Sequence, residues 1–487
     1  MTKKKIILLF FLLIVIISGL KAQIKGFQRT YGLPGFNYGV SSFQTSDKGY
    51  MILGNKSGFI GNTDIYIIKT DSNGYLQWDK AIGDDALMIA TDFKQTPDKG
   101  LIISGYTNGL TTQSYDFLII KTDSLANIEW KKSFGGSDWD FAYSVAVIPN
   151  TAYFIAGKTY DNTHGMADGF LAGIALNGDT LWTKTIGGAG EDVINSIDTT
   201  LDGNLIAAGY TNSSGNGGFD FFLIKITPAG NVLWTKTYGQ EGDEKAYCAR
   251  ATVDGGFVII GSSNSPPAIN LDPWLVKTNN IGDSLWNYYY FNNKDEEFFD
   301  IKQLNNGNYL LAGYTTTWGL GGKDLFTHLV GPTGEFLNGT TYGGDHDDIA
   351  YSCGVASDNG YFFTGTTESK GLGLSNIYFI KTNEYCYTDT NSIHIMAVQN
   401  EKYDDFSINI FPNPASYFIN VIIENITDRN IKICIYDMYG KIIYTSYENV
   451  FDKKILYKQN IESLIPGIYF ININTSKINK TLKFIVN

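Results

Sequence analysis

The chain has 487 residues, of which 43% are hydrophobic and 14% aromatic, and it carries 49 acidic against 37 basic side chains. This length allows two or three domains with a large core, and the net charge of −12 argues against nucleic-acid binding. Four cysteines are too few for a dense disulfide framework. A bridge between Cys353 and Cys386 is possible, and buried free thiols are the alternative.

Residues 1–23 have the pattern of a secretory signal peptide. Three lysines, Lys3 to Lys5, precede an apolar run, and the small residue Ala22 stands just before Gln23. A retained N-terminal anchor is the alternative interpretation. No later segment approaches the roughly 18 apolar residues that a membrane span needs. We therefore expect the mature chain to lack a transmembrane segment and to be secreted or attached to the outer-membrane surface.

A repeat of 52 residues runs through the chain from residue 24 to residue 385. Its tryptophans are Trp78, Trp130, Trp182, Trp234 and Trp286. Around Gly209, one unit contains four short segments of alternating or apolar character at 191–200, 205–211, 220–227 and 231–239, separated by turn residues such as Asp-Gly. This pattern is typical of antiparallel strands joined by tight turns.

Seven copies of a four-stranded unit predict an all-β fold, a seven-bladed β-propeller over residues 24–385. The seventh copy stops after its third strand, near Cys386. The segment GFQRTYG, residues 26–32, matches the fourth strand of the other copies, with Phe27 in the place of the tryptophan. We expect this N-terminal strand to complete the last blade, which leaves the ring without a free edge.

The repeated tryptophan suits packing between adjacent blades, because an aromatic side chain can bury about 150–250 Å² there. A row of tryptophans that binds sugars is the alternative. The phrase formed by Asp71, Gly74 and Trp78 resembles the tryptophan-docking repeat of quinoprotein-type propellers. The resemblance covers one turn and one strand.

Two acidic series share the spacing of the repeat, and both are expected at the same face of the propeller, together with its most variable loops. One hypothesis is that they bind Ca²⁺ there, or a cationic or polyhydroxy ligand, since hard cations prefer several carboxylate oxygens. Alternatively, they accept hydrogen bonds from turn amides. The first series opens the first strands at Asp140, Asp192, Glu244, Glu296 and Asp348, and the second opens the third strands at Asp64, Asp116, Asp168, Asp220, Asp272 and Asp324.

No catalytic residue is predicted, and no cofactor apart from Ca²⁺. The histidines, at 164, 328, 346 and 394, have no metal-ligand spacing. The propeller segment lacks a cluster of three arginines that could hold a carboxylate. We expect a binding or adhesion protein whose ligand is a glycan or a protein. A secreted carbohydrate-active hydrolase that uses carboxylates on the loop-rich face stays open, because such a pair is recognised only in space.

After a polar segment at 386–405, interpreted as a linker, residues 406–487 are rich in Ile, Asn, Lys and Tyr and lack the 52-residue repeat. Short apolar strands between Pro, Asn and Gly turns predict a small, immunoglobulin-like antiparallel β-sandwich there.

Four motifs in this segment, FPNPA, IYDMYGK, LIPGIYF and the terminal KTLKFIVN, resemble the C-terminal sorting domain of type IX secretion substrates in Bacteroidetes-type bacteria. The resemblance implies that the type IX translocon and its sortase are partners, and that the protein is released or anchored after export. The residues that match the motifs are Pro412, Asn413, Pro414, Gly440, Lys441, Gly467 and Tyr469.

Overall fold

The structure is a computed structural model that divides the chain into two compact units, Met1–Val398 and Gln399–Asn487. The expected signal peptide lies outside the described residues. Within the described part of the chain, no helix is long and apolar enough to cross a membrane. The structure describes residues 26–486 except 33–34, 58–62, 85, 110–113, 162, 267, 269, 291, 372, 389–392, 396–406, 412–414, 416, 425–429, 438–440, 451–453 and 476–478.

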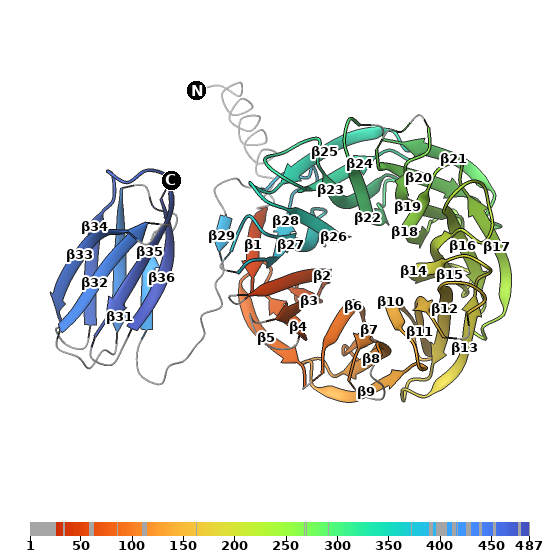
Figure 1. Ribbon diagram of the computed structural model, residues 1–487, viewed down its shortest axis with the longest axis horizontal. Coiled ribbons are helices and arrows are strands. Elements are labelled where there is room, and N and C mark those ends of the chain that lie inside the picture. Colours follow the sequence, from red (N-terminus) through yellow and green to blue (C-terminus); the bar gives the residue numbers. More distant parts are fainter. Residues whose placement is uncertain are drawn as a thin grey trace, which may run out of the picture. The chain divides into compact units, whose positions relative to one another are not determined.

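Seven antiparallel sheets form a ring in the first unit, and each sheet is one blade (Figure 1). Blade 1 contains β2 (Phe36–Gln44), β3 (Tyr50–Ser57), β4 (Thr63–Thr70) and β5 (Leu76–Ile82). Blade 2 contains β6 (Met88–Gln95), β7 (Leu101–Thr107), β8 (Asp116–Thr122) and β9 (Ile128–Phe134). Blade 3 contains β10 (Asp140–Ile148), β11 (Ala152–Thr159), β12 (Asp168–Ile174) and β13 (Thr180–Ile186).

The remaining blades repeat this order. Blade 4 contains β14 (Asp192–Thr199), β15 (Leu205–Thr211), β16 (Asp220–Ile226) and β17 (Val232–Tyr238). Blade 5 contains β18 (Glu244–Ala251), β19 (Phe257–Ser263), β20 (Asp272–Thr278) and β21 (Ser284–Tyr289). Blade 6 contains β22 (Glu296–Gln303), β23 (Tyr309–Thr315), β24 (Asp324–Val330) and β25 (Phe336–Tyr342). Blade 7 contains β26 (Asp348–Val355), β27 (Tyr361–Thr367) and β28 (Asn376–Lys381).

Burial along one blade explains its sequence pattern. Every residue of β16 is buried, because the third strand is covered on both faces by neighbouring blades, and its sequence DFFLIKI is nearly continuous in apolar residues. The outermost strand β17 alternates exposed and half-buried side chains, as its sequence VLWTKTY does. A turn with Gly230 at a φ of 82° joins the two strands.

Strand β1 (Phe27–Tyr31) closes the ring. It pairs antiparallel with β28, which places Phe27 opposite Lys381, the register in which Trp234 stands opposite Lys225 in blade 4. The sequence-based prediction that the N-terminal strand completes the last blade is confirmed. Beyond it, β29 (Ile393–Ile395) pairs in parallel with β1. Part of the segment interpreted as a linker is therefore a fifth strand of this sheet.

The repeated tryptophans pack against the next blade. The indole of Trp182 donates a hydrogen bond to the carbonyl of Pro228, at 2.9 Å, across the junction between blades 3 and 4. A Cβ on Gly230 would lie 2.8 Å from the ring of the same tryptophan. Trp130 and Leu176 repeat the hydrogen bond at 3.2 Å. The tryptophan and the glycine of the following turn therefore recur together at Trp130, Trp182, Trp234 and Trp286, whereas Ala126 takes the place of the glycine after Trp78.

A buried lysine forms a second repeated contact within a blade. Lys225 pairs with Asp202 at 2.7 Å, and four other blades contain the same pair, Lys69–Asp47, Lys121–Asp98, Lys277–Asp254 and Lys381–Asp358. Blades 3 and 6 have lost both partners together. Gly173 and Leu329 replace the lysine, and Asn150 and Asn306 replace the aspartate. This joint loss avoids a buried charge without a partner.

The C-terminal unit is a β-sandwich. One sheet has the order β30-β31-β34 and the other β33-β32-β35-β36, and side chains from both sheets form one core. The strands are β30 (Ser407–Phe411), β31 (Phe418–Glu424), β32 (Asn430–Asp437), β33 (Ile442–Asn449), β34 (Lys454–Asn460), β35 (Gly467–Asn474) and β36 (Asn479–Val486). All four cysteines of the chain are free and buried, so Cys353 and Cys386 form no bridge.

The indole–glycine contact can be tested with two substitutions in blade 4. Gly203 and Gly230 both have a positive φ, but a Cβ at Gly203 would meet no atom within 4 Å. Gly203→Ala should cost about 1–2 kcal/mol of unfolding free energy through backbone strain alone. Gly230→Ala should cost about 1–3 kcal/mol more, because it also overpacks Trp182. Chemical denaturation of both variants measures the difference, and equal losses would contradict the contact.

Candidate functional site

The acidic series lie at the beginnings of strands, as predicted, but apart from the half-buried Asp64 these residues are buried. Asp192 accepts hydrogen bonds from the amide of Gly188 at 2.9 Å and the hydroxyl of Ser213 at 2.6 Å. Asp220, in the second series, accepts one from the amide of Asn216 at 2.9 Å. In both cases the donor amide lies four residues before the acid. The same spacing occurs at Asp140, Glu244, Asp348, Asp168 and Asp324.

The two series meet at the junctions between blades. A Cβ on Gly239 would lie 1.6 Å from Asp220 Oδ1 and 2.9 Å from Glu244 Oε2, so the carboxyl of one blade faces that of the next. Gly135, Gly187 and Gly343 mark three further junctions of this kind. Burial, with a smaller contribution from acidic neighbours, raises the pKa of Asp140, Asp220 and Asp324 to about 6.

These junctions do not fit Ca²⁺. The cation needs six to eight oxygen ligands, whereas amide N–H groups point at these carboxylates. Among the described residues, no group of three or more His, Cys, Asp or Glu side chains could hold a metal ion. Of the remaining predicted residues, Asp64, Asp116, Asp272 and Glu296 stand at or beside the beginnings of their strands, like the rest of the series.

The structure brings a different set of residues together, at the centre of the ring. A cavity of about 590 Å³ is lined by the innermost strands of all seven blades, β2, β6, β10, β14, β18, β22 and β26 (Figure 1). Each of these strands contains a register shift at the same place in the repeat, and the residue after the shift lines the cavity. These residues, which we call the bulge ring, are Ser41, Asp92, Ser144, Ser196, Cys248, Asp300 and Ser352.

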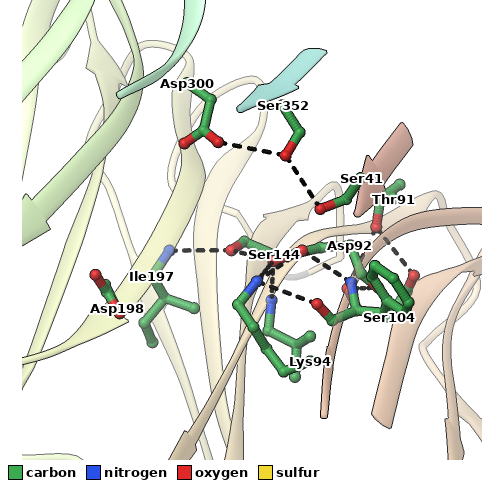
Figure 2. Close-up of polar contacts among 12 residues, drawn as sticks. Ser41, Thr91, Asp92, Lys94, Ser104, Ser144, Ile197, Asp198, Asp300 and Ser352 are labelled. Carbon is green, nitrogen blue, oxygen red and sulfur yellow. Dashed lines mark hydrogen bonds and ion pairs between the residues drawn. The ribbon is translucent and has the colours of Figure 1, made fainter. Parts of the chain in front are cut away.

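The bulge ring connects neighbouring blades by hydrogen bonds (Figure 2). Ser144 Oγ accepts one from the amide of Ile197 at 3.3 Å, and Asp300 Oδ2 accepts one from the amide of Cys353 at 3.1 Å. Ser41 and Ser352 join blades 1 and 7 at 3.4 Å between their hydroxyls. A short polar side chain at this position therefore satisfies a backbone group of the next blade.

Two residues further along the strands, charged side chains line the cavity. We call Lys94, Asp198, Arg250 and Lys302 the charged ring. Arg250 contacts Asp300 at 2.8 Å, and Lys94 contacts Asp92 at 2.7 Å. Burial opposes ionisation of Asp300, but the charges of Lys302 and Arg250 outweigh it and lower its pKa to about 2. Asp300 is therefore charged at neutral pH.

Asp198 differs from the other acids of the cavity. It accepts a hydrogen bond from the amide of Thr199 at 2.8 Å. Among the described residues, no lysine or arginine nitrogen lies within the 4.0 Å that defines an ion pair with it. Asp198 thus lines the cavity from β14, and its carboxylate oxygens can accept further hydrogen bonds (Figure 2).

Aromatic residues line the cavity nearer the end at which the innermost strands begin. Tyr143, Tyr247, Phe299 and Tyr351 each stand one residue before the bulge ring. Phe299 lies 5.0 Å from Tyr247 and 5.5 Å from Tyr351 between ring centroids. The cavity therefore combines aromatic, polar and charged layers. Sequence reasoning missed this set, although the repeat contains a partial signal: the register position of the bulge ring is Ser, Asp or Cys in every copy.

The carboxyl pairs at the blade junctions predict an unusual dependence of stability on pH. A carboxyl with a folded pKa of about 6 binds a proton more readily in the folded than in the unfolded chain. This stabilisation is present at low pH and is lost as the pH rises through about 6. The unfolding midpoint of the propeller should therefore be higher at pH 5.5 than at pH 7.5, by a few degrees in a thermal scan. In a variant with Asp140, Asp220 and Asp324 changed to Asn, the difference should shrink.

The predicted sorting residues fall only partly within the described chain. Pro412, Asn413, Pro414 and Gly440 lie outside it. The amide of Lys441 donates a hydrogen bond to Asp437 at 2.9 Å, and Gly467 begins β35. Tyr469 is buried, and its hydroxyl donates to the carbonyl of Ile465 at 3.0 Å. The described residues among them thus hold a turn and the core of the sandwich.

Known proteins resemble separate parts of the chain. Regulatory protein FlaEY of Caulobacter vibrioides is 24% identical over 179 residues, which are 32% of this chain and 19% of that protein. The chain thus spans about a fifth of this relative's length. A crystal structure of puromycin hydrolase is 12% identical, with a TM-score of 0.48, over 79% of this chain and 58% of that one. The β-propeller domain of the Trilobed protease from Pyrococcus furiosus is 10% identical, with a TM-score of 0.34, over 75% and 96%.

The C-terminal unit matches a family directly. Residues 409–487 match the model of the secretion system C-terminal sorting domain, over the segment in which the sequence motifs occur. The expected resemblance is confirmed there. The chain therefore ends in a type IX secretion C-terminal sorting domain and is a type IX secreted β-propeller protein.

Proposed function

We propose that the propeller is a binding protein. Its central cavity binds a small peptide that carries both a free ammonium group and a free carboxylate. The observation that carries this proposal is the charged ring, where Asp198 and the cations Lys94, Arg250 and Lys302 line one cavity. A volume of about 590 Å³ suits a small ligand, since such sites commonly measure roughly 300–1,000 Å³.

The layers of the cavity favour a ligand with an aromatic or apolar part beside its charged groups. Three residues separate Tyr247 from Arg250 along β18, which is about 10 Å of strand. A dipeptide can extend over this distance. Its ammonium group would pair with Asp198 and its carboxylate with the cations, while its side chain would pack on Tyr247 and Phe299.

Delivery by type IX secretion gives this binding protein its place outside the cell. We infer that the sortase of the pathway processes the C-terminal domain and that the propeller acts on the cell surface or in the medium. The acidic rows do not favour the hydrolase alternative, because they are buried and bonded to backbone amides. An adhesive role needs the same propeller and differs only in the size of the ligand.

Calorimetric titration of the purified chain with tyrosyl-alanine tests the cavity. We expect saturable binding that Asp198→Asn weakens by about 10- to 100-fold, because a hydrogen bond to a charged group contributes about 1.5–3 kcal/mol. Asp283→Asn is the matched control, since it removes one negative charge from an exposed turn outside the cavity. N-acetyl-tyrosyl-alanine amide, which carries neither charge, should not bind. Equal binding of both ligands would contradict the proposal.

Removal of residues 399–487 tests the delivery step separately. The truncated chain should accumulate in the periplasm, because the sorting domain that the translocon recognises is absent. Cell fractionation with an antibody against the propeller measures this. An unchanged propeller unfolding midpoint would show that misfolding is not the cause. Normal surface display of the truncated chain would contradict the sorting role.

A further inference from the structure

A second cavity, of about 730 Å³, lies at the outer strands of blades 5 and 6. It is lined by the end of β21, by β24 and β25, and by the loop that contains Trp318. None of its lining residues belongs to the central cavity. Its aromatic residues are Tyr288, Tyr289, Tyr290, Trp318, Phe326, Phe336 and Tyr387.

Blade 6 departs from the repeat at this place. Asn338 replaces the tryptophan found in the same position of blades 1 to 5. His328 of β24 stands opposite Gly339 of β25, whereas blade 4 has Ile224 opposite Thr235 at the equivalent pair. The glycine carries no side chain over the imidazole, and a Cβ there would lie 3.0 Å from His328 Cδ2. Two departures from the repeat in blade 6 therefore coincide with this cavity.

Several aromatic rings around the cavity are exposed to solvent. The exposed fraction is 57% for Trp318, 53% for Phe336, 52% for Tyr387 and 38% for Tyr288. Large apolar side chains that gather at one concave place commonly mark a binding site. Packing of the propeller does not require these rings, because Trp318 and Tyr387 lie in loops.

A polar atom beside these rings, His328 Nδ1, is buried and has no hydrogen-bond partner within the described chain. Thr340 Oγ1 is a second such atom, but Thr340 stands opposite Thr327, so its side chain lies on the other face of the sheet from His328. His328 itself is only 5% exposed, with its ring 4.4 Å from that of Phe326 and 4.8 Å from that of Phe336. Burial lowers its pKa to about 3, so the imidazole is neutral at physiological pH. A buried polar group without a partner is costly, and a ligand hydroxyl would satisfy it.

The cavity contains no charged side chain. Its lining includes no Asp, Glu, Lys or Arg among the described residues, and its polar groups are phenols, hydroxyls, one amide and the neutral imidazole. A charged ligand would lose its hydration there without gaining a partner. The ligand that fits is uncharged, has apolar C–H faces for the rings, and has a hydroxyl for the buried imidazole nitrogen.

We propose that this cavity of blades 5 and 6 binds a neutral sugar, with the ring of the sugar against Trp318 and Tyr387 and a hydroxyl directed at His328. The site is separate from the central cavity and does not depend on the function proposed for it. It would give a secreted propeller a second specificity, for glycans.

Titration of the full chain with the methyl glycosides of glucose, galactose and mannose tests the proposal, with tryptophan fluorescence and calorimetry as readouts. At least one glycoside should bind saturably, and glucuronic acid, which carries a charge, should bind at least tenfold more weakly. Trp318→Ala should weaken the binding at least tenfold. Trp139→Ala is the matched control, because Trp139 is 51% exposed in a loop of another blade.

Two further variants separate hydrogen bonding from folding. His328→Phe preserves an aromatic ring in the core and removes the imidazole nitrogens, whereas Thr340→Val removes a buried hydroxyl on the other face of the sheet. Both should keep the unfolding midpoint within a few degrees. His328→Phe should weaken glycoside binding at least fivefold, while Thr340→Val and Asp283→Asn should leave it unchanged. The proposal would be overturned if none of the glycosides bound saturably, or if indole bound and no glycoside did. Equal losses of glycoside binding in Trp139→Ala and Trp318→Ala would also overturn it.

Discussion

The pairing of β1 with β28 is the contact on which the rest of the propeller depends. Strands from residues 27 and 381, separated by almost the whole length of the ring, share one sheet and hold blade 7 together. Once the ring is closed, every blade has two neighbours. In blades 1 to 5 the indole of the outer strand can then lie on the next turn, and the bulge-ring residues can form hydrogen bonds with the neighbouring blade. The inner strands face one another only under this constraint, and the central cavity is its result.

Much of this architecture could be predicted from the repeat. Spacing alone located the strands, the closing segment around Phe27 and the acidic ends, because periodic packing imposes periodic residues. The central cavity could not be found in this way. Its lining depends on a register shift in the innermost strands, for instance between Ala246 and Cys248. The residue type at the shift differs between blades, so it does not predict the shift. His328 was visible in the sequence, but only its pairing with Gly339 shows that it lies under an open surface.

The acidic rows show how one residue type can mislead. Repeated carboxylates on a loop-rich face suggest a cation site, yet the chain folds amides onto them and buries them in pairs. This arrangement fixes where each strand begins and leaves charge in the interior at neutral pH. The buried lysines are stabilised differently, because each of them forms an ion pair with an aspartate. Blade 4 contains both arrangements, at Asp192 and at Lys225, and in the central cavity Arg250 and Asp300 form an ion pair of the second kind.

The fifth strand of blade 7 has a consequence for the fate of the secreted protein. β29 covers the outer edge of β1, the strand that closes the ring, and it ends at Ile395, before the sorting domain begins at residue 409. A proteolytic cut between these two positions would therefore leave β1 and β29 on the same fragment. Maturation at that place would remove the sorting domain and keep the closing strand of the propeller covered.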